Sequence, residues 1–90
     1  MSIDVTLQNV HVNGQWIEGD VVVTVNELGL NFSTTAHFKT LKDVEKEIDL
    51  GSGIKLIATL TLEPSNNVCI SGKIKKDFLS FDVPKKCFPI

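Results

Sequence analysis

The chain has 90 residues with a formal net charge of −2 at pH 7, and its 42% hydrophobic and 22% charged content excludes a disordered protein. This length fits one domain over residues 1–90, and no apolar run approaches the ~20 residues of a membrane span. All nine basic residues are Lys and Arg and Tyr are absent, so we expect no nucleic-acid partner, because such partners are bound through guanidinium forks and aromatic platforms.

Turn residues recur every ~8–12 residues and separate short segments of strand character. Two of these segments, around 28–38 and 54–62, alternate apolar and polar residues, so one face is buried and the other meets water. The sequence therefore predicts an all-β domain, a single antiparallel β-sandwich of about seven to eight short strands, with a closed β-barrel as second choice. The expected strands are 3–12, 15–18, 21–26, 30–39, 44–50, 54–63, 68–75 and 78–83.

The first expected strand changes phase halfway along its length. Ile3, Val5 and Leu7 share one parity, whereas Val10 and Val12 share the other. A β-bulge near residues 8–9 would return all five side chains to the core, because one extra residue re-aims everything after it. The alternative is that the chain passes from one sheet to another at this point.

The Asn13-Gly14 pair predicts a hairpin with a type I′ turn. In that register His11 lies opposite Trp16, and Asn9 lies opposite Glu18. With Val10 and Ile17 in the core, the candidate binding group is His11, Trp16, Asn9 and Glu18, together on the outer face. Trp offers a large rigid surface with a polar handle to a partner. The alternatives are a His–Trp pair that only stabilises the hairpin, and a register in which Trp16 is buried.

Residues 40–50 can be interpreted in two ways. Leu41, Val44 and Ile48 fall at helical spacing, which favours a short helix near 41–49 that ends at Gly51. Val44, Ile48 and Leu50 also fit one face of a strand, and a hairpin with the next strand is natural. We expect a strand here.

Catalytic and metal-binding patterns are missing from the sequence. His37 falls on the water-facing side of its strand and is interpreted as a solvated residue. No His or Cys pair has metal-ligand spacing, and no Ser has the context of a nucleophile. The acids between 43 and 49 alternate with Lys and indicate a solvated face. We therefore expect no enzyme activity, no cofactor and no metal site.

Cys69 and Cys87 raise the question of redox state. Alternation places Cys69 on the outer face, and a turn at 75–77 would bring residue 69 opposite 83–84, near Cys87. A disulfide between the two is therefore geometrically reasonable, whereas in the cytosol both would stay reduced. The first residues lack the basic and apolar segments of a signal peptide. We expect a cytoplasmic protein, with secretion as the alternative if a signal peptide has been removed.

These observations favour a non-catalytic binding or interaction module that uses an exposed strand face to bind a protein or a glycan. The alternative is a small β-barrel with an internal apolar cavity, serving as a lipid or small-molecule carrier or as a cofactor-free isomerase or cyclase. A third hypothesis is a structural assembly subunit. Such a subunit would form a homodimer through a strand edge or through the apolar C-terminal tail at 87–90.

Overall fold

The computed structural model describes residues 2–27 and 29–90, without the side chain of Glu27. Within these residues every regular element is a strand, and no helix is present that could cross a membrane. The strands are β1 (Ser2–Asn13), β2 (Trp16–Glu27), β3 (Leu30–Leu41), β4 (Glu45–Gly51), β5 (Ile54–Glu63), β6 (Asn67–Lys76) and β7 (Leu79–Pro89).

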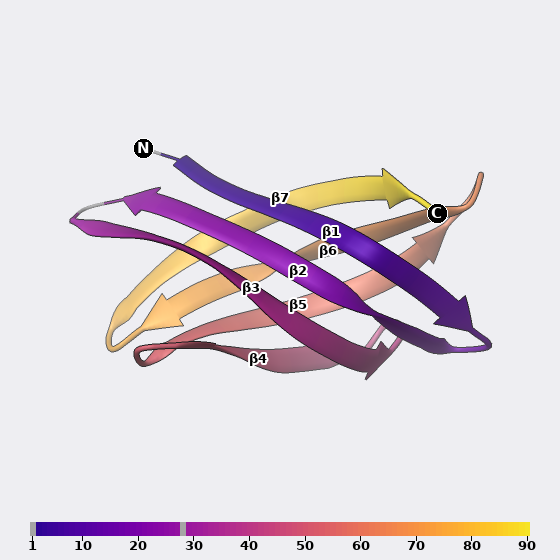
Figure 1. Ribbon diagram of the computed structural model, residues 1–90, viewed down its shortest axis with the longest axis horizontal. Coiled ribbons are helices and arrows are strands. Elements are labelled where there is room, and N and C mark those ends of the chain that lie inside the picture. Colours follow the sequence, from indigo (N-terminus) through magenta and orange to yellow (C-terminus); the bar gives the residue numbers. More distant parts are fainter. Residues whose placement is uncertain (1, 28) are drawn as a thin grey trace.

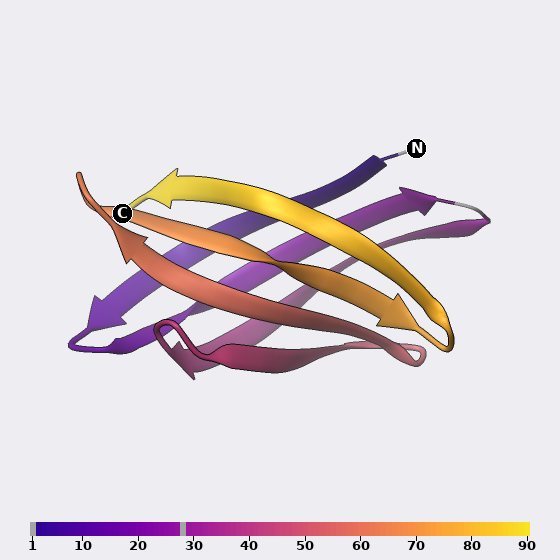
Figure 2. The same ribbon diagram turned by 180° about the vertical axis from the view of Figure 1, so that it is seen from behind.

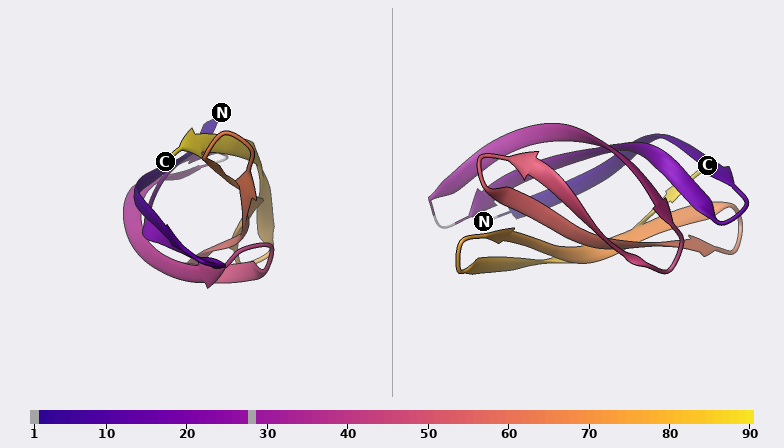
Figure 3. Two further views of the ribbon diagram at one scale, coloured as in Figure 1. Left: turned by 90° about the vertical axis from the view of Figure 1, so that its right-hand side faces the viewer. Right: turned by 90° about the horizontal axis from the view of Figure 1, so that it is seen from below.

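The strands form two antiparallel sheets, and the prediction of an all-β sandwich is confirmed. One sheet has the order β1-β2-β3, and the other has the order β4-β5-β6-β7. Figure 1 shows the three-stranded sheet in front, and Figure 2 shows the four-stranded sheet from the opposite side. The end-on view in Figure 3 shows the two sheets curving toward each other along two seams. The sheets are not hydrogen-bonded into a closed barrel, so the second choice is wrong.

The core lies between the sheets and is built from the alternating positions of the central strands. Val21, Val23 and Val25 of β2 have no exposed surface, and neither have Leu56 and Leu60 of β5. The intervening residues face outward, as the period-two pattern predicts. Each fully buried aliphatic side chain contributes about 1.5–3 kcal/mol to folding by leaving water.

One expectation about the strands is corrected and another is confirmed. The segments 15–18 and 21–26 belong to one strand, because Gly19 continues the β2 ladder opposite Phe38 instead of forming a turn. The described residues 2–27 and 29–90 therefore form seven strands. The expected strand at 44–50 is confirmed and the alternative of a short helix near 41–49 is wrong, since β4 occupies 45–51 and buries Ile48 and Leu50 against the core. The alternation of those two residues outweighed the helical spacing.

The β-bulge near residues 8–9 is confirmed. Between the pairs Gln8–Asp20 and His11–Glu18, two residues of β1 face only Gly19 of β2. Asn9 takes the positive φ of 54° that the extra residue requires. Val10 and Val12 then pack against the core, as the phase change in the sequence indicates.

The sheets meet at two seams that differ in construction. Along one seam β1 runs beside β7, and the Lys86 ammonium lies 3.1 Å from the Asp4 carboxylate. Along the other, β3 runs beside β4, and the chain itself crosses between the sheets at residues 42–44. There the Asp43 N–H donates to the carbonyl of Leu60 at 2.8 Å. Figure 1 shows these seams along the upper and lower borders of the molecule.

Candidate functional site

The hairpin between β1 and β2 has a different register from the predicted one. Asn13 lies opposite Trp16, Val12 opposite Ile17 and His11 opposite Glu18. Gly14 has a φ of +63°, whereas the φ of Asn13 is not positive. The two-residue loop is therefore Gly14-Gln15. Glycine at the first loop position is the mark of a type II′ turn. The predicted I′ register is therefore wrong by two residues on β1, since Trp16 lies opposite Asn13 and not His11.

The outer face of β1-β2-β3 carries a shallow hollow of about 110 Å3 beside this hairpin. Three of the four predicted binding residues, His11, Trp16 and Glu18, line it together with Asn13 and Lys39. The Lys39 ammonium lies 5.4 Å from the centroid of the Trp16 ring, within the range of a cation–π contact. The side chain of Trp16 is 45% exposed, so a partner can reach the indole.

Leu41 adds a second apolar group to this face. It lies directly opposite Trp16 in the β2–β3 register and remains 38% exposed. Directly opposed side chains on one sheet face are about 5 Å apart at Cβ. Trp16 and Leu41 therefore form an exposed apolar pair, and Lys39 and Glu18 lie next to it as an opposed charged pair.

Asn9, the fourth predicted residue, lies apart from the hollow, in a polar network centred on His37. The Asn9 amide donates to Asp20 Oδ2 at 3.2 Å, and Asp20 Oδ1 lies 3.0 Å from His37 Nδ1. On the other side of the ring, His37 Nε2 lies 2.9 Å from Glu18 Oε2. The imidazole thus bridges two carboxylates of β2, and Glu18 belongs both to this network and to the hollow.

The network shifts the titration of its members. Hydrogen bonds to Asp20 and then to Glu18 raise the pKa of His37 above its ordinary value of 6.5. The hydrogen bond from His37, followed by that from Asn9, lowers the pKa of Asp20 below 3.8. The protonated imidazole donates to both carboxylates at once, which the neutral ring cannot do. Both ring nitrogens are engaged on opposite sides, so neither is directed toward a common metal position.

Sequence reasoning missed Lys39, Leu41 and Asp20, and interpreted His37 as merely solvated. His37 is indeed exposed, but its position opposite Asp20 gives it two partners. A signal for this existed, since a hairpin that pairs Glu27 with Leu30 sets the register that pairs His37 with Asp20. Counting back from that hairpin would also have placed Leu41 opposite Trp16.

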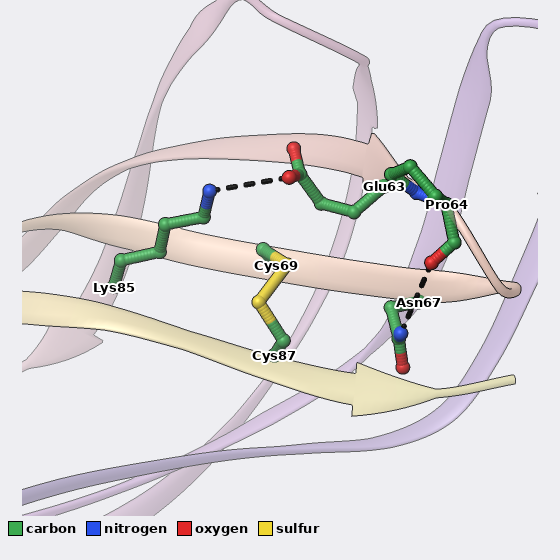
Figure 4. Close-up of a disulfide and its surroundings, with 6 residues drawn as sticks. All are labelled: Glu63, Pro64, Asn67, Cys69, Lys85 and Cys87. Atoms are coloured by element: carbon green, nitrogen blue, oxygen red, sulfur yellow. Dashed lines mark hydrogen bonds and ion pairs between the residues drawn. A yellow bond between two sulfur atoms is a disulfide. The ribbon is translucent and has the colours of Figure 1, made fainter.

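Cys69 and Cys87 are joined in a disulfide on the outer face of β6 and β7 (Figure 4). They lie directly opposite each other in the register, so the expected pairing of residue 69 with 83–84 is wrong. The turn lies later than expected, with Lys76 opposite Leu79, and a bulge in which Pro84 and Lys85 oppose one residue of β6 shifts the pairing by one more residue. Cys69 is only 1% exposed although it faces outward. An ion pair from Lys85 to Glu63, at 3.2 Å, bridges β7 and β5 beside it.

Other exposed groups lie away from the hollow. Phe78, in the turn between β6 and β7, is 99% exposed. This turn and the β1–β2 turn lie at opposite ends of the sandwich (Figure 1). Within residues 2–27 and 29–90, no three metal-ligating side chains converge on one position.

Comparison with known protein families, with curated proteins and with solved structures gave no match.

Proposed function

We propose that this protein is a non-catalytic interaction module, and that the outer face of β1-β2-β3 binds a protein partner. One observation carries the proposal: Trp16 and Leu41 form an exposed apolar pair with charged residues next to it. Binding hot spots combine a Trp or another large side chain at the centre with a polar rim that excludes water.

The rim offers charges of both signs in fixed positions. The Lys39 ammonium is held near the indole, and the carboxylates of Glu18 and Asp20 are held by His37. Side chains that are already ordered lose less conformational entropy on binding. A partner surface with an apolar side chain between an acidic and a basic group would match this arrangement.

A protein is favoured over a glycan as the partner. A sugar ring stacks on a bare aromatic face, whereas Lys39 lies over the face of Trp16. The hollow next to the ring, at about 110 Å3, is also well below the 300–1,000 Å3 typical of small-molecule pockets. The alternative of a carrier with an internal cavity has less support, because its premise was a closed barrel and the two sheets are separate.

The test compares two exposed aromatic residues at opposite ends of the molecule. A protein partner is isolated on the wild-type protein and purified, and its affinity is then measured calorimetrically for wild type, Trp16→Ala and Phe78→Ala. Loss of a hot-spot Trp costs at least about 2 kcal/mol, so Trp16→Ala is expected to weaken binding about thirtyfold. Phe78→Ala is expected to change it less than about threefold.

Circular dichroism establishes that each variant is folded. Unchanged partner affinity in folded Trp16→Ala would contradict the proposal. The glycan alternative is tested by titrating a panel of mono- and disaccharides while following the Trp16 indole N–H by NMR. Saturable sugar binding at that indole would replace the protein partner with a glycan.

A further inference from the structure

The edge of β3 remote from β2 offers free main-chain groups at its N-terminal end. The Lys42 N–H donates to the Gln15 carbonyl at 2.8 Å, just beyond the end of the β2–β3 ladder. Bonded and non-bonded pairs alternate in an antiparallel ladder, so even-numbered residues of β3 bond to β2. The N–H and C=O groups of Asn31, Ser33 and Thr35 therefore point away from β2. Among the described residues, β3 pairs with no other strand.

The other three outer strands are protected against pairing with a further strand. β1 has its bulge, and Asp4 ties it to β7. β7 has a bulge together with Pro84 and Pro89, and Lys85 and Lys86 add charge. β4 is short, and four of its seven residues are charged. Bulges, prolines, charges and short length are the devices that keep sheet edges from associating.

β3 has none of these devices over residues 29–36. This stretch contains no charged residue and no proline, and β3 as a whole is twelve residues long with an unbroken register to β2. A hollow of about 370 Å3 adjoins it, and its apolar lining includes Leu30 and Phe32 of β3 and Leu50 and Ile54 from the other sheet. Leu30 and Phe32 are only half-buried.

We propose that the free edge of β3 pairs in antiparallel fashion with the same edge of a second copy of this chain. The pairing would be main-chain addition of one strand to another, which extends β1-β2-β3 into a six-stranded sheet. It uses a surface distinct from the Trp16 face, so it does not depend on the function proposed above.

The occupant is a second copy because β3 is complementary to itself. In a two-fold pair centred on Ser33, Asn31 lies opposite Thr35 of the other copy, and Phe32 lies opposite Thr34. No charged residue of 29–36 meets a like charge, which would be destabilising directly across two strands. Side-chain alternation also places Leu30 and Phe32 of the second copy on the face of the extended sheet where the hollow lies. The charged β4 edge and the proline-containing β7 edge do not match this surface.

The test measures association by sedimentation equilibrium from micromolar concentration to about 1 mM, a range that detects dissociation constants up to about 1 mM. The variant Ser33→Pro removes an edge N–H that is not bonded to β2, and proline is tolerated on the free side of an edge strand. Ser33→Lys keeps the N–H and places two ammonium groups opposite each other. Ser80→Lys puts the same charge on exposed β7 and serves as the matched control.

Wild type and Ser80→Lys are expected to dimerise with equal affinity within about twofold, since Ser80 lies outside the pairing edge. Both Ser33 variants are expected to dimerise at least about tenfold more weakly, because each disrupts the central pair. Amide hydrogen exchange at Asn31, Ser33 and Thr35 should slow with concentration in wild type but not in Ser33→Lys, whose exposed side chain leaves folding intact.

Wild type that remains monomeric at about 1 mM would overturn the proposal. So would Ser33 variants that dimerise as wild type does, because the contact would then lie elsewhere. A capped peptide of residues 29–37 should compete with the dimer. If a capped Thr-Val octapeptide competes equally well, the edge accepts any extended strand and the assignment to a second copy is wrong.

Discussion

The sheet β1-β2-β3 and the sheet β4-β5-β6-β7 cover the same aliphatic core, but different chemistry holds their outer faces together. The three-stranded sheet carries His37 between Asp20 and Glu18, a network that depends on protonation. The four-stranded sheet carries the Cys69–Cys87 disulfide, beside the Glu63–Lys85 ion pair. The contacts on the outer face of one sheet are therefore expected to change their contribution to stability with pH, and those on the other with reductant. Because the sheets share one core, they unfold together.

The edge strands extend this comparison. β1 and β7, which form one seam, both carry bulges, and Gly19 and Gly72 lie at those bulges on the neighbouring strands. At the other seam β3 is regular throughout its register. The regular strand β3 leaves main-chain groups unpaired, whereas the two glycines allow close backbone approach within each sheet, Gly19 to β1 and Gly72 to β5. The same substitution at these two glycines compares how closely the backbones pack within the two sheets.

The largest expected effect is that of Gly72→Ala in the four-stranded sheet. A Cβ there would overlap the carbonyl oxygen of Ile57 and lie 2.9 Å from Ala58 Cα, so β5 would have to shift. We expect the free energy of unfolding to fall by at least about 3 kcal/mol in urea titrations. Gly19→Ala is the matched change, with its nearest neighbours at 3.1 Å on the bulged β1, and should cost about 1 kcal/mol. Equal losses in the two variants would contradict the difference between the sheets.

The second effect is that of removing the disulfide. Cys69 and Cys87 are 18 residues apart, and closing a loop of this size stabilises a fold by about 3 kcal/mol in the chain-entropy model. The double variant Cys69→Ala with Cys87→Ala should lose that amount in urea titrations. Adding dithiothreitol to wild type should give the same loss and leave the double variant unchanged. A reductant effect that persists in the double variant would show a different cause.

The third effect is the pH dependence of the His37 network. Because the folded-state pKa of His37 is raised above 6.5, its stabilisation is complete below pH 6.5 and is lost as the pH rises through the folded value. Because the pKa of Asp20 is lowered, its contribution is present above pH 3.8 and is lost on further acidification. The melting temperature of His37→Gln should therefore fall furthest below wild type between about pH 4 and 6.5.

The control for this prediction removes both carboxylates. In the background Glu18→Gln with Asp20→Asn, the change in melting temperature caused by His37→Gln should no longer vary with pH across that window. A variation that survives in this background would mean that the titrating partner of His37 lies elsewhere.

The smallest effect concerns the ion pair across the β1–β7 seam. Asp4 and Lys86 are both largely exposed, and exposed pairs contribute less than about 1 kcal/mol. Asp4→Asn should therefore lower the free energy of unfolding only slightly. Raising the salt concentration should lower the free energy of unfolding of wild type by a similar amount, since salt screens the two charges. A larger loss would show that the pair fixes the β1–β7 seam.

Much of the fold could be predicted from the sequence because it depends on local alternation. The parity of β5 and β3 placed Leu56, Leu60 and Phe38 in the core, and the phase change in β1 located the bulge at Asn9. With Ile17 in the core, alternation within β2 also placed Trp16 and Glu18 on the outer face. The expected number of strands was seven to eight because Gly19, followed by Asp20, is typical of a turn.

It was harder to predict which residues lie opposite each other on neighbouring strands, because this depends on loop geometry. A loop of Gly14-Gln15 instead of Asn13-Gly14 moves every β1 residue by two against β2, for example His11 from Trp16 to Glu18. The bulge in β7 moves Cys87 into line with Cys69. The hollow at Trp16 needs Lys39 from β3, and the polar network needs His37, so the candidate site combines three strands whose registers the sequence specifies only through their turns.

The disulfide also bears on how the protein would transmit a mechanical load. Cys87 lies three residues from the last residue of the chain, and its partner Cys69 lies 18 residues earlier. When the ends of an oxidised molecule are pulled apart, tension passes from residue 69 to residue 87 through the sulfur bridge and bypasses the β6–β7 hairpin. That hairpin would bear no tension. The end-to-end length of the fully extended oxidised chain would be about 60 Å shorter than that of the reduced chain.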